Sequence, residues 1–293
     1  MNKTIYSQLR PRRRAQVILY FVGQLLMDLT SFLASLSDSG IDIVQPFDAR
    51  WYDALIEQEG LTKQLKPLPK MGSRDGALGF LLGNSRALWP AFLKWLSDQP
   101  DAEAIADPLD KYIASVIQPA VRLLTGKEMR HELIWPWESG DRLVSMQRVA
   151  VCSGLCYHDG ETQLAIHPKF GAWIAFRAVL ILDAAPSVCG LPSKAPEPVP
   201  CLMTSDEKEA ARAAMAAALR ASDEANLCTQ LHGANGMKTD VRLAWAALRD
   251  CVRVGRQYRY CALPKNAAAI AWRAQSAGVV ERRSVIVVGA AAR

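Results

Sequence analysis

One arginine lies inside the most hydrophobic run of the chain. In residues 172–182 every side chain is apolar except that of Arg177, and such a continuous run is typical of a strand that is buried on both faces. A guanidinium stays protonated, so a buried one needs a partner, and an anion can be that partner. Its planar fork suits a carboxylate. The sequence thus indicates an anion-binding arginine, and the alternative is a structural salt bridge with Glu132, Glu138 or Asp183.

The segment HPKFGAW, residues 167–173, stands directly before this run. His167 could tempt one to assign a metal ligand, but a hydrogen-bonded histidine at a strand end is the more ordinary interpretation. Gly171 is expected to give backbone clearance beside a flat ligand. Phe170 and Trp173 are residue types found more often in a core than in a ligand wall. The segment predicts a turn that leads into the buried strand.

Two further candidates lie near the C-terminal end. Arg249 falls near the end of a helix expected over residues 240–252, where a cation is favourable for ordinary electrostatic reasons. Tyr258 lies in the basic and aromatic stretch 256–260, for which a surface loop is the plain interpretation. The residues alone leave both roles open.

The motif HPKFGAW, followed by an apolar strand with an arginine, resembles the CblC-type cobalamin-processing family, the cyanocobalamin reductase/alkylcobalamin dealkylase proteins. Weaker matches follow one another from about residue 40 to residue 260. The chain departs from the family pattern at both ends and at Val151, where relatives often carry histidine. The weaker matches are QPFDARWY at 45–52, LGFLLGNS at 78–85, DPLD at 107–110, the segment 147–157, the pair Arg249-Asp250, and Tyr258.

This resemblance implies a function and a set of ligand contacts. It implies removal of the upper axial ligand of cobalamin, by flavin-dependent reductive decyanation of cyanocobalamin and by glutathione-dependent dealkylation of alkylcobalamins. Arg177 and Arg249 would bind glutathione, which has two carboxylates, and no residue is assigned as catalytic because cobalt and the thiolate carry the chemistry. FMN or FAD would supply electrons. The residues implied to bind cobalamin are Gln147, Ser153, Gly154, His167, Phe170, Gly171, Trp173 and Tyr258.

Several alternatives to this reading stay open. The protein could be a non-catalytic cobalamin carrier, or a flavin nitroreductase-like enzyme without cobalamin.

The resemblance also implies base-off cobalamin without a protein histidine on cobalt, and a possible downstream cobalamin-trafficking protein as partner. No GxGxxG, P-loop, GxSxG or HExxH motif is present, which leaves nucleotide-binding, serine-hydrolase and zinc-protease readings without support.

The distribution of charge argues against a nucleic-acid partner. The net charge is +6 and the pI about 9.0, but residues 1–14 carry +5 and residues 253–293 carry +7, so the body between them is acidic. Seven cysteines without framework spacing favour a reduced compartment and no zinc site. We therefore expect a cytoplasmic protein, with organelle targeting through the Arg-rich N-terminus as the alternative.

Helical periodicity in residues 15–36 predicts an amphipathic helix docked on the domain rather than a membrane span. The division expected is a basic extension at 1–14, a cobalamin-processing domain at 15–263 and a tail at 264–293. The fold expected is α+β, and the family resemblance implies a nitroreductase-like flavoprotein fold with a central, mostly antiparallel sheet flanked by helices.

The local signals predict the following elements. Strands are expected at 42–52 (with a turn), 77–82, 134–137 and 172–182, with a hairpin from Tyr157 through Asp159-Gly160 to 162–167; helices at 85–96 capped by Ser85, 107–124 capped by Asp107, 141–152, 204–221 opened by a Thr204–Glu207 capping box, and 240–252; irregular chain at 63–76, 183–203 and 226–237.

Overall fold

Four antiparallel strands form the centre of the fold in a computed structural model, which describes residues 28–72, 76–126, 128–232 and 239–259. Their order across the sheet is β1 (Ile43–Asp48), β2 (Leu78–Asn84), β6 (Ala175–Leu182) and β3 (His131–Ile134). Every residue of β2 is buried, as are the last seven of β6. These two strands therefore need apolar side chains on both faces, which explains their continuous hydrophobic runs.

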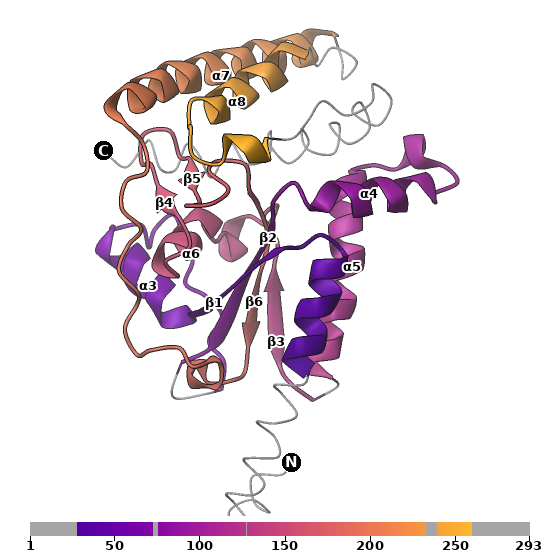
Figure 1. The fold of residues 1–293 in the computed structure, drawn as a ribbon, viewed down its shortest axis with the longest axis vertical. Coiled ribbons are helices and arrows are strands. Elements are labelled where there is room, and N and C mark those ends of the chain that lie inside the picture. Colours follow the sequence, from indigo (N-terminus) through magenta and orange to yellow (C-terminus); the bar gives the residue numbers. More distant parts are fainter. Residues whose placement is uncertain (1–27, 73–75, 127, 233–238, 260–293) are drawn as a thin grey trace, which may run out of the picture.

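Helices cover both faces of this sheet (Figure 1). On one side lie α4 (Leu88–Ser97), α5 (Pro108–Thr125) and the helical residues 28–38. On the other lie α3 (Ala49–Gln58) and the short α6 (Met146–Cys152). Side chains of β6 alternate between the two layers, with Leu180 in the first hydrophobic cluster and Ile181 in the second. The alternation is what a two-sided layer requires.

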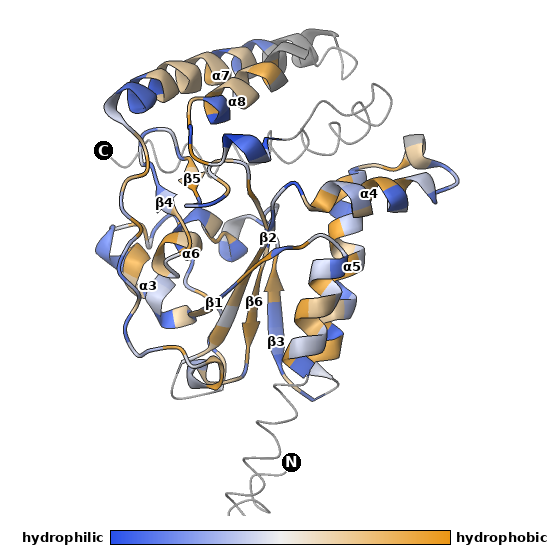
Figure 2. Cartoon of the chain, viewed as in Figure 1, coloured by the Kyte–Doolittle hydropathy of each residue, from blue (hydrophilic) through white to orange (hydrophobic). Residues whose placement is uncertain are grey.

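A third hydrophobic cluster lies at the upper end of the sheet in Figure 1. It joins the two-stranded hairpin of β4 (Tyr157–His158) and β5 (Ala165–Ile166) to the paired helices α7 (Ser205–His232) and α8 (Thr239–Asp250). Short 3-10 helices complete the fold: η1 (Ala102–Ala104), η2 (Gly140–Arg142), η3 (Pro186–Cys189) and η5 (Arg256–Tyr258). Figure 2 shows β6 mostly in hydrophobic colours, part of β3 in blue, and η5 in hydrophilic colours.

The α+β class with an antiparallel central sheet flanked by helices is confirmed. The capping box is also confirmed, because Thr204 N donates to the Glu207 carboxylate over 2.7 Å and Glu207 N donates to Thr204 Oγ1 over 3.3 Å. The hydrophobic strands and the irregular 183–203 connection are found as well, with one 3-10 turn in the latter.

One helix was missed, and two helix predictions were wrong at their starts. The turn expected after β1 is the helix α3, which Asp48 caps by accepting from Arg50 N. The helix expected from residue 85 begins at Leu88; the Ser85 hydroxyl donates to the Asp42 carboxylate and accepts from Ala87 N over 3.2 Å. The helix expected from residue 141 begins at Met146, where Ser145 is the cap.

Other boundaries also differ from expectation. The strand expected at 134–137 ends at Ile134, since Pro136 cannot donate to a ladder. The strand expected from residue 172 begins at Ala175. Asp107 precedes α5 as predicted, but no side-chain bond caps the helix and its φ of 47° is left-handed. Helix α7 runs to residue 232, so the loop expected from 226 was wrong in its first part.

The hairpin is confirmed, but its turn is not the tight Asp-Gly turn that the sequence suggested. Asp159 accepts from Thr162 N over 2.9 Å and from Thr162 Oγ1 over 2.6 Å. The positive φ, 57°, falls on Gln163. The connection is longer than two residues, and β5 is correspondingly shorter than 162–167.

The amphipathic helix predicted over 15–36 is observed from residue 28, and its first part lies outside the described residues. Phe32 and Leu36 are fully buried, and Tyr112 of α5 donates to the Ser39 carbonyl just beyond the helix. The helix is therefore docked by its apolar face, as expected. The segments 1–14 and 264–293 lie outside the described residues. None of the helices described is long and apolar enough to cross a bilayer.

Docking of this helix predicts a clear difference between two adjacent residues. Phe32 packs edge-on against Phe80 of β2, with ring centroids 5.8 Å apart, whereas Leu33 is 39% exposed. Phe32→Ala should lower the free energy of unfolding by about 3–5 kcal/mol, and Leu33→Ala by less than about 1 kcal/mol. Urea unfolding of the full chain measures both. Equal effects would mean that the helix does not dock as observed.

Candidate functional site

Arg177 is the extra residue of a β-bulge. Phe176 pairs with Gly83 and Ala178 pairs with Leu82, so Arg177 has no counterpart on β2. A Cβ on Gly83 would come 2.8 Å from the Ala175 carbonyl oxygen, so glycine permits the irregular pairing. Bulges re-aim a side chain and are frequent beside functional sites. The guanidinium is buried, with 4% of the residue exposed.

The structure gives Arg177 a neutral neighbour at one nitrogen. Its Nε donates to Asn84 Oδ1 over 2.6 Å. Two of the acids considered as salt-bridge partners are engaged elsewhere, because Glu132 and Glu138 both pair with Arg142. The third, Asp183, follows the far end of β6, about 20 Å along the strand from Arg177. The alternative of a salt bridge with these three acids is thereby weakened.

His167 organises the turn of the HPKFGAW segment. Its ring Nδ1 accepts from Lys169 N over 3.0 Å and from Phe170 N over 3.3 Å, while His167 and Gly171 exchange backbone hydrogen bonds. A ring nitrogen that accepts from backbone amides carries no proton, so the neutral imidazole has its hydrogen on Nε2. Burial, assisted by the charge of Lys169, lowers the pKa of His167, against a smaller opposing effect of Asp42. The structural interpretation of this histidine is supported.

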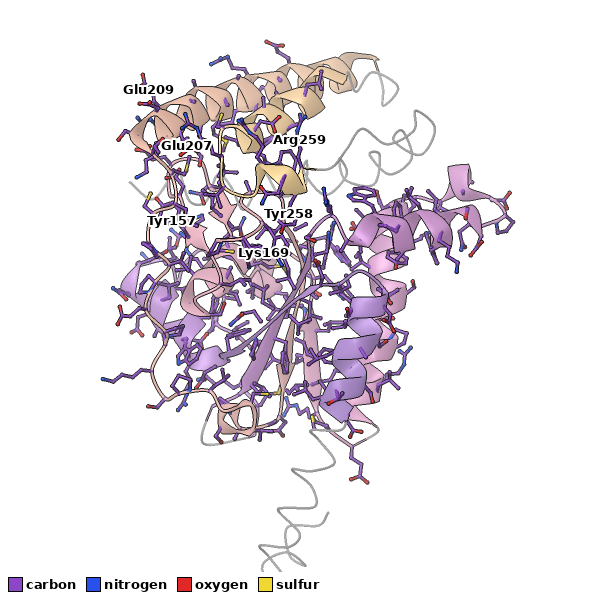
Figure 3. The ribbon with its side chains drawn as sticks, viewed as in Figure 1. Tyr157, Lys169, Glu207, Glu209, Tyr258 and Arg259 are labelled. Atoms are coloured by element: carbon purple, nitrogen blue, oxygen red, sulfur yellow. The ribbon has the colours of Figure 1, made fainter. Side chains whose placement is uncertain are left out.

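An aromatic pair joins this turn to the C-terminal segment. Phe170 contacts Tyr258 edge-on, with centroids 4.8 Å apart, and also lies 4.8 Å from the His167 ring. Cations flank the pair: Lys169 Nζ lies over the Phe170 ring, and the Arg86 guanidinium lies over the Tyr258 ring. Figure 3 shows Lys169 directly below Tyr258. The sequence-predicted residues Phe170 and Tyr258 are thus brought together.

Two glycines let the backbones of these segments cross at contact distance. A Cβ on Gly171 would overlap the Val254 carbonyl oxygen, and a Cβ on Gly255 would overlap the backbone of Phe170 and Gly171. Both have positive φ, 59° and 71°. The clearance at Gly171 therefore serves this crossing, which differs from the flat ligand that the sequence suggested. Its place among cobalamin contacts stays a prediction.

Two guanidiniums, those of Arg249 and Arg259, lie over the ring of Trp173. The Arg249 and Arg259 guanidinium carbons lie 5.9 and 5.7 Å from the ring centre. Arg259 also pairs with Asp250 over 2.7 Å. Arg249 lies in the last turn of α8, so its ordinary role at a helix end is satisfied, yet its side chain leans on the motif tryptophan. Trp173 itself is 4% exposed and thus largely core, as its residue type suggested.

The other implied cobalamin residues form a separate group on α6. Gln147 is half-buried and accepts weakly from the Ser145 hydroxyl. Ser153 is buried, and Gln45 of β1 donates to its carbonyl over 3.1 Å. Gly154 has a positive φ and lies against Pro196. Their contacts reach β1 and the 183–203 connection, and α6 packs with Phe170 in the second hydrophobic cluster.

Sequence reasoning missed four residues of this site. Asn84 ends β2 and Arg86 follows it, and neither type stands out in a sequence. Lys169 lies inside the quoted motif, and Arg259 lies inside the basic stretch that contains Tyr258, so their neighbours offered a signal. Only the bulge and the backbone crossing show why these four meet the predicted residues.

The arrangement is suited to binding anions and flat rings. Arg86, Lys169, Arg249 and Arg259 present positive charge beside aromatic faces, which suits phosphate and carboxylate groups. Burial raises the pKa of the Cys152 thiol to about 12 and that of Cys156 further, so neither offers a thiolate at neutral pH. Among the described residues, no group of three or more His, Cys, Asp or Glu side chains could hold a metal ion.

Comparison with known proteins supports the resemblance seen in the motifs. No family model matches the chain. It is 24% identical over 197 residues to a cyanocobalamin reductase/alkylcobalamin dealkylase of Danio rerio, covering 61% of this chain and 73% of that protein. It is 27% identical over 177 residues to the protein of the same name from Bos taurus, covering 55% and 58%. The resemblance to the CblC-type family is confirmed.

Solved structures were compared as well. A B12-trafficking protein CblC from C. elegans aligns with a TM-score of 0.49 at 17% identity, covering 78% of this chain and 98% of that one. An epoxyqueuosine reductase aligns with the same score at 13% identity, covering 83% and 69%.

The depressed pKa of His167 predicts a pH dependence of stability. The folded protein disfavours the imidazolium, so this histidine's contribution is present above its unfolded pKa of about 6.5 and is lost as the pH falls through the folded value. In His167→Asn the amide oxygen can still accept from the turn but does not titrate. The variant should lose less stability than the parent between pH 7 and pH 5 in urea unfolding.

His158 has a pKa that is also lowered, chiefly by burial, but it remains in both proteins, so the difference reports His167. Identical losses in parent and variant would contradict the assigned role.

Proposed function

We propose, from its similarity to the CblC-type cobalamin-processing proteins, that this chain removes the upper axial ligand of cobalamin. The substrates would be cyanocobalamin, which is reductively decyanated, and alkylcobalamins, which are dealkylated by glutathione. One observation carries the proposal: the turn of the HPKFGAW motif packs through Phe170 on Tyr258, and through Trp173 on Arg249. Residues implied by the family from distant parts of the sequence thus meet at one end of the sheet.

The chemistry of these side chains supports a flat, phosphate-bearing ligand. Cobalamin has a corrin ring and a phosphodiester in its nucleotide tail. Phe170 and Tyr258 offer aromatic faces, while Lys169 and Arg86 offer cations beside them. Nδ1 of His167 accepts hydrogen bonds within the turn, so this nitrogen is not free to bind cobalt. This agrees with the proposal that cobalamin binds without a protein histidine on cobalt. Gln147 of α6, with Ser153 and Gly154 directly after this helix, would contribute a further part of the surface.

Arg177 and Arg249 would bind the two carboxylates of glutathione. In dealkylation the thiolate attacks the alkyl carbon, the carbon–cobalt bond breaks, and its electron pair stays on cobalt as cobalt(I). The protein's part is to hold the thiolate in line with that bond and to exclude water. A buried guanidinium at a bulge is suited to this task, because its low-polarity surroundings strengthen a charged hydrogen bond.

Decyanation needs electrons rather than a nucleophile. Reduced FMN or FAD would supply them to cobalt, and cyanide would leave. The cations Arg86 and Lys169 beside the aromatic pair suit the phosphate and ring of a flavin as they do those of cobalamin. The chain's residues would bind and orient both molecules.

The domain that carries this function would be residues 15–263, with residues 1–14 and 264–293 outside it. Cobalamin(I) or cobalamin(II) released from such a site is reactive towards oxygen, so a downstream cobalamin-trafficking protein would be the partner that receives it.

Cobalamin binding is tested by one absorbance titration. Added full-length protein should shift the visible band of methylcobalamin to shorter wavelength, towards that of the acidified free cofactor, because the lower benzimidazole is displaced. An unchanged spectrum at excess protein would overturn the proposal. Base-off binding without any dealkylation or decyanation would favour the carrier. Flavin-dependent nitroreduction without a spectral shift would favour the nitroreductase-like alternative.

The glutathione site is tested by a double-mutant cycle on glutathione affinity. Arg177→Gln should weaken binding by about 1.5–3 kcal/mol, since a charged hydrogen-bonded contact is lost. If Arg249→Ala removes a contact to the same ligand, the two changes should couple by about 0.5 kcal/mol or more.

Arg142→Gln is the matched control, because this exposed arginine pairs with Glu138 and Glu132 away from the site. It should leave glutathione affinity unchanged. Strict additivity of the first two changes, or an Arg249→Ala effect confined to thermal stability, would return Arg249 to a helix-end role.

A further inference from the structure

Arg86 joins two segments that lie far apart in the sequence. It stands between β2 and α4, and its Nη1 donates to the carbonyl of Gln257, 171 residues further along the chain, over 2.8 Å. Its guanidinium carbon lies 5.6 Å from the centre of the Tyr258 ring. One planar group thus binds the backbone of η5 through a nitrogen and lies over the ring of the next residue.

The backbone that carries Arg86 is anchored on both sides. Ser85 N and Oγ donate to the Asp42 carboxylate over 2.7 and 2.5 Å, and Ser85 Oγ accepts from Ala87 N over 3.2 Å. The carbonyl of Arg86 accepts from Trp89 N over 3.2 Å, in the first turn of α4. The side chain of Arg86 is exposed, but it starts from a fixed point.

The carbonyl that Arg86 binds lies at the end of a short helix. The 3-10 helix η5 has three residues, and Tyr258 N donates to the Gly255 carbonyl over 2.8 Å. Helices of this kind are short, and the carbonyls at a helix end have no partner within the helix. The donor that Gln257 O receives from Arg86 therefore stabilises η5 from outside.

Arg86 acts on the part of the segment that the glycine crossing leaves unfixed. The crossing at Gly255 sets where the backbone passes the motif turn, but the Tyr258 side chain lies three residues further on. Two contacts hold its ring: Phe170 meets it edge-on and the guanidinium of Arg86 lies over it. Loss of Arg86 would leave the edge contact with Phe170, which by itself permits more than one ring orientation.

We propose that Arg86 is a positioning residue, which holds η5 and the Tyr258 ring against the motif turn and so keeps this wall of the ligand site in place. The inference rests on the proposed function, in which the pair of Phe170 and Tyr258 borders cobalamin. A direct attraction of the Arg86 charge for a ligand phosphate is a separate effect, because it does not need the Tyr258 ring.

The test is a double-mutant cycle in the full chain, with Arg86→Met, Tyr258→Leu and the two combined. Met keeps the length of the side chain and removes both contacts of the guanidinium, and Leu keeps apolar bulk without the ring. Arg253→Met is the matched control, since it removes an exposed arginine from the same segment and keeps the backbone bond to Glu207. The readouts are the dissociation constant of methylcobalamin, from its visible spectrum, and amide hydrogen exchange over 254–259 in the ligand-free protein.

Arg86→Met should weaken methylcobalamin binding by about three- to tenfold, but should have little further effect in the Tyr258→Leu background, where the ring it positions is absent. Amides over 254–259 should exchange faster in Arg86→Met, on the order of fivefold, and at the parent rate in Arg253→Met. Binding effects that multiply in the double variant would assign Arg86 to direct contact with the ligand and overturn the inference. Unchanged exchange in Arg86→Met would overturn it as well.

Hydrogen exchange separates this outcome from failure of the proposed function, because it is measured without cobalamin. A parent protein that leaves the methylcobalamin spectrum unshifted would remove cobalamin as the ligand. Faster exchange in Arg86→Met alone would then still show that Arg86 holds the Tyr258 segment, and equal exchange in all four proteins would remove that role too.

Discussion

The crossing of two backbones at Gly171 and Gly255 is the constraint on which the candidate site depends. Neither residue has room for a Cβ, so the turn of the motif and the segment after α8 touch main chain to main chain. Everything that makes the site lies on these two segments or against them: Phe170 and Trp173 on one side, Tyr258 and Arg259 on the other. A side chain at either glycine would separate the two segments and disperse the site.

The cations of the candidate site differ in the groups that hold them. Of the two arginines on Trp173, one is paired with Asp250 and the other leans on the ring through its face. An aromatic face holds a guanidinium without neutralising it. The buried Arg177 is likewise oriented by an amide. Arg259 thus has a carboxylate partner, whereas the contacts described for Arg249 and for Nε of Arg177 are with uncharged groups.

The sequence predicted the elements that depend on local patterns and on apolar burial. It did not predict helix starts and site residues that depend on contacts between distant parts of the chain. The buried strand around Arg177, the capping box at Thr204 and the docked N-terminal helix follow from composition and periodicity, and all were found. The start of α4 was wrong by three residues, and there the Ser85 hydroxyl contacts Asp42, 43 residues away in the sequence, which no local rule contains. Asn84 was missed for the same reason: its importance arises from a bulge, and a bulge is a property of two strands together. The family motif located Phe170 and Trp173, while the structure showed which cations lie beside them.

The carboxylate of Glu207 contacts both ends of the segment that contains α7 and α8. Glu207 accepts from Thr204 N at the start of α7 and from Arg253 N just after α8, each over 2.7 Å. The two ends of a segment of more than forty residues are thus held by a single side chain, that of Glu207, which Figure 3 labels beside the start of α7. Because both ends are held there, the chain after Arg253 starts from the same place whatever the lengths of α7 and α8. We therefore expect α7 and α8 to tolerate a change in length by whole helical turns without displacement of Tyr258 and Arg259.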